Sequence, residues 1–465
     1  MVGELICAMM EGKGRGVIAR HSIAASDLLL CARPAVVLEG PPDPEGAPDA
    51  ARLVPALVQA ANAQDVPQIR AALQYLYDGT DASRLQLPDI RTMMNLAKHS
   101  SSSSSSSSSS LQEGLQESCC DHDHSSGHHH HHHDSHSHSA AEPAAADADK
   151  LTEQQASLLV KYNAFADDYE DLAAAAVRGA AMPHSHVGLW PQFALFNHSC
   201  LPNSVHYLVG HAMVVRAVED VAAGEELTVS YLGREEFAPA GARQAVLQER
   251  YGFACGCARC QLESQAPRQL QQQLLDTYRQ VMQAPRQLQQ QLLDTYWQVM
   301  QDLKPRFLEA VEHQDQSNLA AVQAQLQTLE HFLSAALQQH RAVLSDSAVL
   351  VLQAAVYDLY ELLLFCEQLL PQGNEAESKH AALACIGRCL AILNCVSKGA
   401  ELHVFLASRL LQHAVDLRGP DSAQAEAAAQ LFLEAHRMRY GSQLEQQVQL
   451  ELMEANKQAA EEFLM

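Results

Sequence analysis

The chain has 465 residues, which is enough for two or three domains, and 47% of them are hydrophobic, as in ordinary globular proteins. Its 55 Asp and Glu residues outnumber 31 Lys and Arg residues, so the formal net charge is −24. This charge excludes nucleic-acid binding through a broad basic face and suits a basic protein partner. The sequence shows neither a charged-then-apolar leader nor a run of 18 apolar residues, so we expect neither secretion nor a membrane span.

The twelve cysteines indicate a reducing compartment, because the sequence offers no secretory context in which a disulfide framework would form. We therefore expect a location in the cytoplasm and/or nucleus, with free thiols and one metal site. The compact group Cys255-x-Cys257-x-x-Cys260 supplies three thiolates, one short of a tetrahedral structural zinc site.

Residues 1–40 predict short strands around a glycine turn, with Gly12, Gly14 and Gly16 followed by Val17 and Ile18. A dinucleotide-binding fingerprint would need a long helix directly after its glycines, and the β-branched residues here predict a strand instead. A simple hairpin turn without a ligand is the other alternative.

Two short helices are predicted within Leu53–Tyr77, and Met93–Ala97 is predicted to continue helical structure. Residues 99–149 are of low complexity, with an unbroken serine run and a histidine-rich tract at 122–138. They cannot bury enough apolar surface to offset the entropy of ordering, so we predict a disordered insertion. The pair Cys119-Cys120 beside the histidines would bind metal only adventitiously.

Residues Leu151–Ala180 are predicted to be helical throughout. The segments Val205–Val209 and Ala212–Ala217 flank Gly210 and predict a β-hairpin, and Leu227–Tyr231 predicts a further strand.

From Gln265 onward the composition becomes helical, and residues 265–282 repeat as 283–300 with one difference, Arg279 against Trp297. The unit equals about five helical turns, so its duplication preserves the phase of the apolar stripe, although Pro285 should kink the array. Six further helices are predicted at 304–343, 346–370, 378–396, 399–417, 421–439 and 443–464. Cys385 and Cys389 would share a helix face, as metal ligands or, more commonly, as buried thiols.

One set of motifs carries a family resemblance: Asn197-His198-Ser199-Cys200, then Gly224-Glu225-Glu226-Leu227-Thr228-Val229-Ser230-Tyr231, then Tyr251, Phe253 and the three-cysteine group. In this order they resemble the catalytic half of a SET-domain protein lysine methyltransferase. The N-terminal Lys13-Gly14-Arg15-Gly16 is similar to the cofactor-side motif of that family. The nearest relatives by this resemblance are the SET-and-MYND-domain proteins, but the chain has no MYND zinc finger. Trp190 stands where these relatives often have tyrosine.

The resemblance implies an α+β fold, in which a SET domain of short strands carries a post-SET zinc site and precedes an all-α, tetratricopeptide-like C-terminal lobe. The implied division of the chain is 1–98 for the N-terminal SET half with a helical insertion, 99–150 for the disordered insertion, 151–240 for the C-terminal SET half, 241–262 for the post-SET zinc segment and 263–465 for the helical lobe.

The resemblance also implies roles for individual residues. Tyr231 and Tyr251 would be catalytic tyrosines of the lysine channel. The S-adenosylmethionine cofactor would be bound by Lys13, Arg15, Asn163, Ala194, Asn197, His198, Tyr231 and Phe253. Zinc would be held by Cys200, Cys255, Cys257 and Cys260, with His184 or His186 as the alternative to Cys200.

The predicted function is transfer of a methyl group from S-adenosylmethionine to a lysine of a histone or non-histone protein. Free lysine has a pKa of about 10.4, and a narrow apolar channel would favour the neutral amine that this displacement needs. The alternative is a catalytically inactive SET scaffold that binds partner proteins through its helical lobe. We expect a monomer without direct contact to nucleic acid or membrane.

Overall fold

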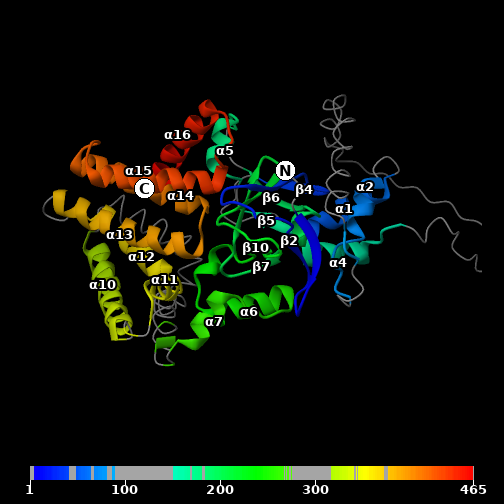
Figure 1. Cartoon of the computed structure of the whole chain (residues 1–465), viewed down its shortest axis with the longest axis horizontal. Coiled ribbons are helices and arrows are strands. Elements are labelled where there is room, and N and C mark those ends of the chain that lie inside the picture. Colours follow the sequence, from blue (N-terminus) through cyan, green and yellow to red (C-terminus); the bar gives the residue numbers. More distant parts are fainter. Residues whose placement is uncertain are drawn as a thin grey trace, which may run out of the picture.

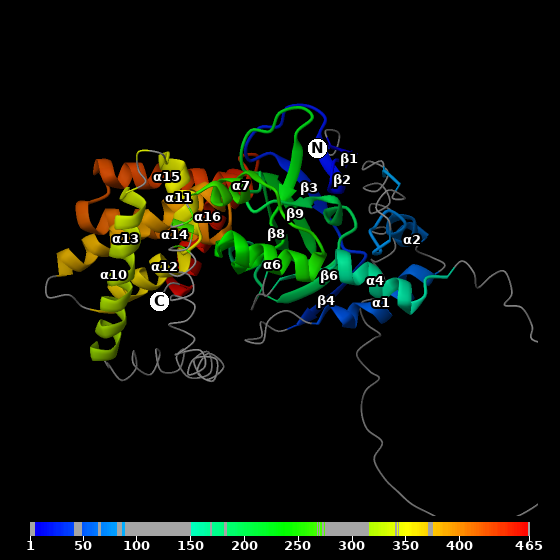
Figure 2. The ribbon, with the colours of Figure 1, turned by 90° about the horizontal axis from the view of Figure 1, so that it is seen from below.

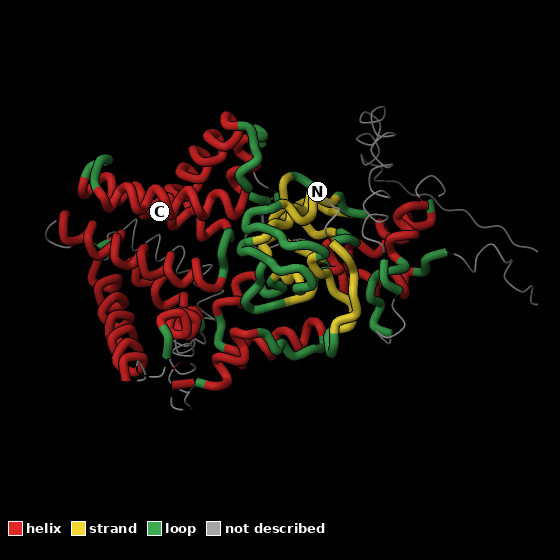
Figure 3. The backbone as a smooth tube through the Cα atoms, in the orientation of Figure 1, coloured by secondary structure: helices red, strands yellow, loops and turns green. Residues whose placement is uncertain are grey.

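The computed structural model describes residues 5–40, 49–63, 67–80, 86–88, 150–167, 170–180, 184–266, 268, 270–271, 274, 316–339, 342, 344–370 and 375–463. Three small sheets lie at the centre of the molecule, with helices α1, α2 and α4 on one side and a large helical lobe on the other (Figure 1, Figure 2). Figure 3 shows the same division, with the strands gathered between the two helical regions.

The first sheet has four strands in the order β1-β2-β10-β7. β1 (Leu5–Met10) and β2 (Gly14–Ala19) form an antiparallel hairpin, whose turn uses the left-handed backbone of Gly12 and Gly14. β10 (Glu226–Val229) pairs antiparallel with β2 and parallel with β7 (Asn197–His198). The glycine turn therefore leads into a strand, as predicted, and a dinucleotide fold is excluded for it.

The second sheet has the order β3-β9-β8, with β3 at Leu28–Ala32, β8 at Ser204–Val209 and β9 at Ala212–Ala217. The predicted hairpin around Gly210 is confirmed by the register of β8 and β9. The third sheet has the order β4-β6-β5, with β4 at Val36–Gly40, β5 at Phe165–Asp167 and β6 at Ser185–Leu189.

Strand β5 corrects the prediction of continuous helix over Leu151–Ala180. Helix α4 (Glu153–Asn163) ends at Ala164, β5 follows directly, and helix α5 (Leu172–Val177) comes after it. Helical spacing alone could not reveal the strand, because its formation depends on pairing with β6, where Phe165 faces Gly188. The two predicted helices near the N-terminus are α1 (Leu53–Asn62) and α2 (Pro67–Leu73), preceded by a 3-10 turn at Ala50–Arg52.

The 3-10 turn η3 (Phe193–Leu195) comes just before β7, and the 3-10 turn η4 (Gly233–Phe237) comes after β10. Beyond η4 the regular elements among the described residues are all helices. The helices that follow are α6 (Ala240–Tyr251), α7 (Ala258–Gln265), α10 (Gln316–Gln339), α11 (Asp346–Ala354), α12 (Tyr357–Leu369), α13 (Glu375–Val396), α14 (Glu401–Arg418), α15 (Ala423–Tyr440) and α16 (Gln446–Phe463).

The predicted helix 346–370 is broken, since α11 and α12 meet at an angle of 80°. The break lies at Val356, whose φ of −136° and ψ of 33° are not helical. Val356 and Tyr357 are fully buried at this corner, so packing in the lobe imposes a bend that the sequence does not mark with Gly or Pro.

Helix α13 is long and apolar enough to span a membrane by length and composition, with a mean hydropathy of 1.3 over Lys379–Val396. The central helix of a packed lobe meets the same criteria. Here Ile386, Cys389 and Leu393 of α13 are fully buried in the core that α12 and α14 share with it.

Some predictions lie outside the described residues: Met93–Ala97, the insertion at 99–149 with Cys119 and Cys120, and most of the duplicated unit. Within the described part of the first copy, Leu270 and Leu274 are buried in the core of the lobe, as the predicted apolar stripe requires.

Candidate functional site

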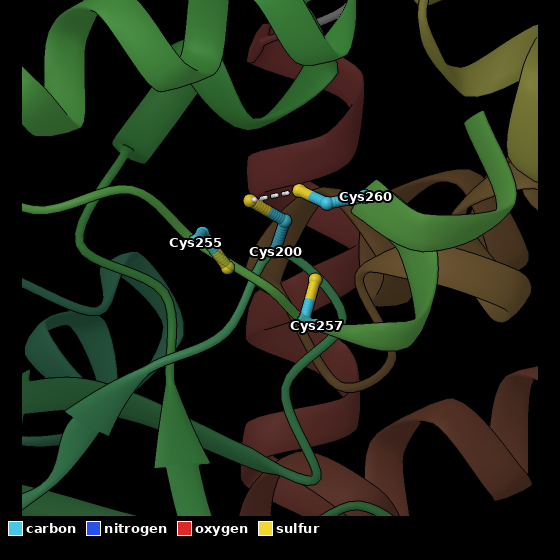
Figure 4. Close-up of side chains that lie close together, drawn as sticks. All are labelled: Cys200, Cys255, Cys257 and Cys260. Carbon is cyan, nitrogen blue, oxygen red and sulfur yellow. Dashed lines mark hydrogen bonds between the residues drawn. The ribbon is translucent and has the colours of Figure 1, made fainter. Parts of the chain in front are cut away.

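Four cysteines converge between the first sheet and the two helices that follow it. The sulfur atoms of Cys200, Cys255, Cys257 and Cys260 all lie within 4.8 Å of one another and point toward a common centre (Figure 4). Cys200 is the second residue after β7, whereas Cys257 is the N-cap residue of α7. The predicted ligand set is thus brought together, and His186 lies elsewhere, in a cluster with Glu39 and His211.

This cluster fits a tetrahedral zinc site. A Zn²⁺ ion held by four sulfurs at about 2.3 Å needs neighbouring sulfurs about 3.8 Å apart. The Sγ atoms of Cys200 and Cys260 are 3.6 Å apart. Hydrogen bonding between Cys255 and Cys200 lowers the pKa of Cys255 and raises the pKa of Cys200, so a thiolate is already favoured among these sulfurs.

Buried cations surround the cysteines. Arg243 donates to Sγ of Cys260 at 3.5 Å, and Arg259 donates to the backbone oxygen of Cys200 at 3.4 Å. Both guanidinium groups also pair with the buried Glu263, at 3.0 Å each. Two buried positive charges beside one carboxylate leave a surplus that an anionic cluster of four thiolates around Zn²⁺ would neutralise.

His198 connects the cysteine cluster to Tyr231, which lies two residues after the end of β10. The backbone N–H of Tyr231 donates to Nδ1 of His198 at 3.0 Å, so the neutral ring carries its hydrogen on Nε2. Nε2 lies 3.2 Å from Sγ of Cys200 and donates toward this sulfur. The buried imidazole of His198 therefore links the Cys200 sulfur to the Tyr231 backbone.

Three aromatic side chains gather beside His198. The ring centroid of Tyr231 lies 5.1 Å from that of Tyr251 and 6.5 Å from that of Phe253. The ring of His198 is 5.3 Å from Tyr231 and 6.0 Å from Phe253. The two predicted channel tyrosines thus lie beside the predicted cofactor residues His198 and Phe253, although Tyr251 and Phe253 come from the end of α6 and the loop after it.

The hydroxyl of Tyr231 donates to the backbone oxygen of Phe196, in the segment just before Asn197. Burial raises the pKa of Tyr231 well above its usual value, and the nearby Tyr251 and Glu226 raise it further. Burial also raises the pKa of Tyr251. Both phenols are therefore neutral hydrogen-bonding groups at physiological pH.

Lys13 and Asn197 meet at a shared acidic partner. Lys13 forms a salt bridge with Glu226, and the side-chain amide of Asn197 donates to the same carboxylate at 2.9 Å. Glu226 is the first residue of β10, one residue before the predicted strand, and it was not predicted as a site residue. Gly16 lies beneath this group, since a Cβ atom there would come within 2.6 Å of the Asn197 amide.

Arg15 lies on the same strand and has a buried guanidinium. It donates to the backbone oxygen of Gln86 at 3.1 Å, and its Nε is buried without a hydrogen-bond partner among the described residues. Burial lowers the pKa of Arg15. A buried cation with an unused donor is the feature that an anionic group of a ligand would satisfy.

The two weakest predicted site residues have structural surroundings. The amide of Asn163 donates to the backbone oxygens of Tyr77 at 2.7 Å and Leu159 at 2.8 Å, so both of its hydrogens are used. Ala194 packs against the core of α1 and α4. The hydrogen bonds of the Asn163 amide do not reach Asn197 or Tyr231, and the role of Asn163 and Ala194 in cofactor binding stays a prediction.

Comparison with known protein families places a SET domain at residues 14–232. This range contains β2, β10 and β7 of the first sheet and Tyr231, whereas β1 lies before it. Because the family match ends at residue 232, it does not itself cover Tyr251 or the last three cysteines.

The chain is also similar to several lysine methyltransferases. It is 40% identical over 84 residues to histone-lysine N-methyltransferase SMYD3 of Homo sapiens, which covers 18% of this chain and 19% of that protein. It is 37% identical over 89 residues to N-lysine methyltransferase SMYD2-B of Xenopus laevis, covering 19% and 20%. It is 40% identical over 74 residues to histone-lysine N-methyltransferase ASHR1 of Arabidopsis thaliana, covering 16% and 15%. The matched region spans no more than about a fifth of the length of these relatives.

Proposed function

We propose, from the premise that this chain carries a SET domain similar to that of the SMYD lysine methyltransferases, that it is a protein-lysine N-methyltransferase that uses S-adenosylmethionine. The observation that carries the proposal is the convergence of Tyr231, Tyr251, Phe253 and His198 in one aromatic cluster beside the four cysteines. These residues come from three separate segments, which follow one another along the sequence in the order of the family motifs.

The cofactor would be held along β2 and β7. S-adenosylmethionine supplies an electrophilic methyl group on a positively charged sulfur. The unused Nε of Arg15 and the ammonium of Lys13 would receive its carboxylate, and the amide of Asn197 would bind its polar groups. Gly16 leaves room for the backbone to approach closely.

The two tyrosines would form the wall that receives the substrate lysine. Their neutral, partly buried phenols would create a low-dielectric environment, which would lower the pKa of an inserted ammonium and favour the amine. Transfer forms a nitrogen–carbon bond while the sulfur keeps the electrons of the broken carbon–sulfur bond, and the product loses a proton to solvent. Alignment of the amine by Tyr231 would supply much of the acceleration.

We also propose a structural zinc ion at the four cysteines, which would fix the segment around His198 against α7. The substrate would be a basic segment of a histone or non-histone protein, because the net charge of the chain is −24. The tetratricopeptide-like lobe is proposed to shape the substrate groove, in a monomer of the cytoplasm and/or nucleus.

The test is incubation of the purified chain with radiolabelled S-adenosylmethionine and cell extract, beside Tyr231→Phe. We expect labelling of a protein by the wild type and a loss of about 100-fold in the variant, since one preorganised hydroxyl is removed. Tyr360→Phe is the matched control, because Tyr360 is a buried tyrosine of α12, away from the aromatic cluster, whose hydroxyl accepts a hydrogen bond from Gln353 at 3.0 Å.

Equal labelling by Tyr231→Phe and Tyr360→Phe would contradict the catalytic role of Tyr231. A folded, zinc-loaded wild type that binds S-adenosylmethionine but labels no protein in any extract would favour the alternative, a scaffold that binds partners through its helical lobe.

A further inference from the structure

A second group of metal-ligand side chains lies on the third sheet, away from the cysteines. Glu39 of β4 and His186 of β6 are directly opposite each other in the antiparallel register, so their side chains leave the same face of the sheet. His211, in the turn between β8 and β9, reaches the same place and hydrogen-bonds to the carboxylate of Glu39. One ligand atom from each of the three lies within 4.8 Å of the other two.

An ordinary surface ion pair with Glu39 does not explain the position of His186, because the His186 ring is buried. Its side chain is 1% exposed, and neither ring nitrogen makes a hydrogen bond of normal geometry among the described residues, although the backbone of His184 interacts weakly with the ring. Its Nε2 lies 3.7 Å from the Glu39 carboxylate, beyond hydrogen-bond distance. Leaving a buried polar group unpaired costs about 1–3 kcal/mol, so this ring needs a partner that would sit between it and Glu39.

The turn that carries His211 is fixed from two sides. The indole Nε1 of Trp190 donates to the backbone oxygen of His211 at 3.0 Å, and the buried Glu170 accepts from the backbone N–H of Gly210 at 2.7 Å. Gly210 adopts a positive φ of 56° in this turn. The ligand position of His211 is thus set by the fold, although its ring is half-exposed.

We propose that Glu39, His186 and His211 form a site for a divalent transition-metal ion, with Zn²⁺ as the best match. Two imidazoles and one carboxylate are a set that Zn²⁺ accepts, at about 2.0–2.2 Å from each donor, and it leaves a fourth position for water. The exposed Glu39 and His211 side chains can close around an ion, whereas His186 provides the fixed ligand. Such an ion would join β4, β6 and the β8–β9 turn, and it is independent of the methyltransferase proposal.

The experiment measures zinc retained by the full chain after dialysis against trace zinc, in wild type, Glu39→Gln, His211→Gln and His331→Gln. The exposed His331 of α10 is the matched control for loss of a surface histidine. The histidine-rich tract at 122–138 is present in all four proteins and contributes equally. We expect Glu39→Gln and His211→Gln to retain about one zinc ion less per chain than wild type and His331→Gln.

Anomalous diffraction at the zinc edge locates the ion in crystals of the same wild-type protein. We expect one peak among the four cysteines and a second among Glu39, His186 and His211. The proposal is overturned if only the cysteine peak appears, or if all four proteins retain the same amount of zinc. Because both ligand variants change exposed side chains, their folding is checked by an unchanged circular dichroism spectrum.

Discussion

At the scale of single residues, the proposed cofactor site along β2 and β7 depends on the lack of a side chain at Gly16. Gly16 faces Asn197, Glu226 and Met10, and the space for a Cβ atom is taken: it would lie 2.6 Å from the Asn197 amide and 2.8 Å from Cγ of Met10. Glycine is therefore needed at position 16 because a larger side chain would not fit, and not because the backbone has a positive φ.

We predict that Gly16→Ala weakens binding of S-adenosylmethionine by about 10-fold while the chain stays folded, because the methyl group displaces the Asn197 amide. Isothermal titration calorimetry measures the affinity. The matched control is Gly241→Ala in α6, where an added Cβ meets no atom within 4 Å. An unchanged affinity in Gly16→Ala would show that Asn197 does not contact the cofactor.

At the scale of elements, the cysteine cluster joins β7 to the start of α7. Three of its sulfurs belong to one short segment, but Cys200 lies nearly sixty residues earlier in the sequence. A metal ion there would close this loop and hold the aromatic residues that follow α6 against His198.

We predict that Cys257→Ser loses about one zinc ion per chain and lowers Tm by about 4 °C or more, because metal binding is coupled to folding. Cys395→Ser, which changes a half-buried thiol at the end of α13, should match the wild type in both measurements. Zinc content and a thermal melt by circular dichroism give the two values. If Cys257→Ser keeps its zinc, the four-cysteine site is wrong.

The sequence predicted the elements whose cues are local, and it missed those that depend on distant partners. Glycines and alternation identified the β1–β2 and β8–β9 hairpins, and the spacing of three cysteines identified most of the cluster in Figure 4. Strand β5 and the bend before Tyr357 were missed, because pairing with β6 and packing in the lobe decide them. Glu226 was missed as a site residue because nothing in a strand pattern shows that it meets Lys13 and Asn197.

At the scale of the whole molecule, a buried charged network joins the strand region to the helical lobe. Asp171, at the start of α5, accepts hydrogen bonds from Arg439 at 2.6 Å and from the Tyr440 hydroxyl at 3.1 Å. Arg439 also donates to the backbone oxygen of Gly399 at 3.1 Å. Removing one partner from a buried pair of this kind typically costs about 3–5 kcal/mol, so the network fixes how α15 sits on α5.

Glu401 makes this junction sensitive to pH. It accepts from the backbone N–H of Leu172 at 2.8 Å, and burial followed by the charge of Asp171 raises its pKa to about 8. Arg439 lowers this pKa in part, and Asp167 raises it. Because the folded pKa lies above the unfolded value, the associated stability is fully present below the unfolded pKa and is lost as pH rises through about 8.

We predict that Glu401→Gln removes this loss, so that its Tm exceeds that of the wild type increasingly between about pH 4.5 and about pH 8, from the ordinary to the raised pKa of Glu401. Thermal melts at several pH values give the difference. Glu426→Gln, an exposed position on α15, should follow the wild type throughout. A constant difference between Glu401→Gln and wild type would contradict the assigned ionisation.

The position of β2 in the first sheet has a consequence for how the chain is made. Ile18 pairs with Glu226, about 200 residues later, so contacts of long sequence separation complete this sheet. During synthesis the free edge of the N-terminal hairpin stays unpaired until β10 has emerged, and it can pair with other chains in the meantime. The entropic cost of closing a loop grows only with the logarithm of its length, so doubling the loop length costs about 0.6 kcal/mol. The serine- and histidine-rich insertion between β2 and β10 is therefore thermodynamically tolerable. Fragments that end before residue 226 should therefore aggregate, whereas changes in the length of the insertion should leave the finished fold almost as stable.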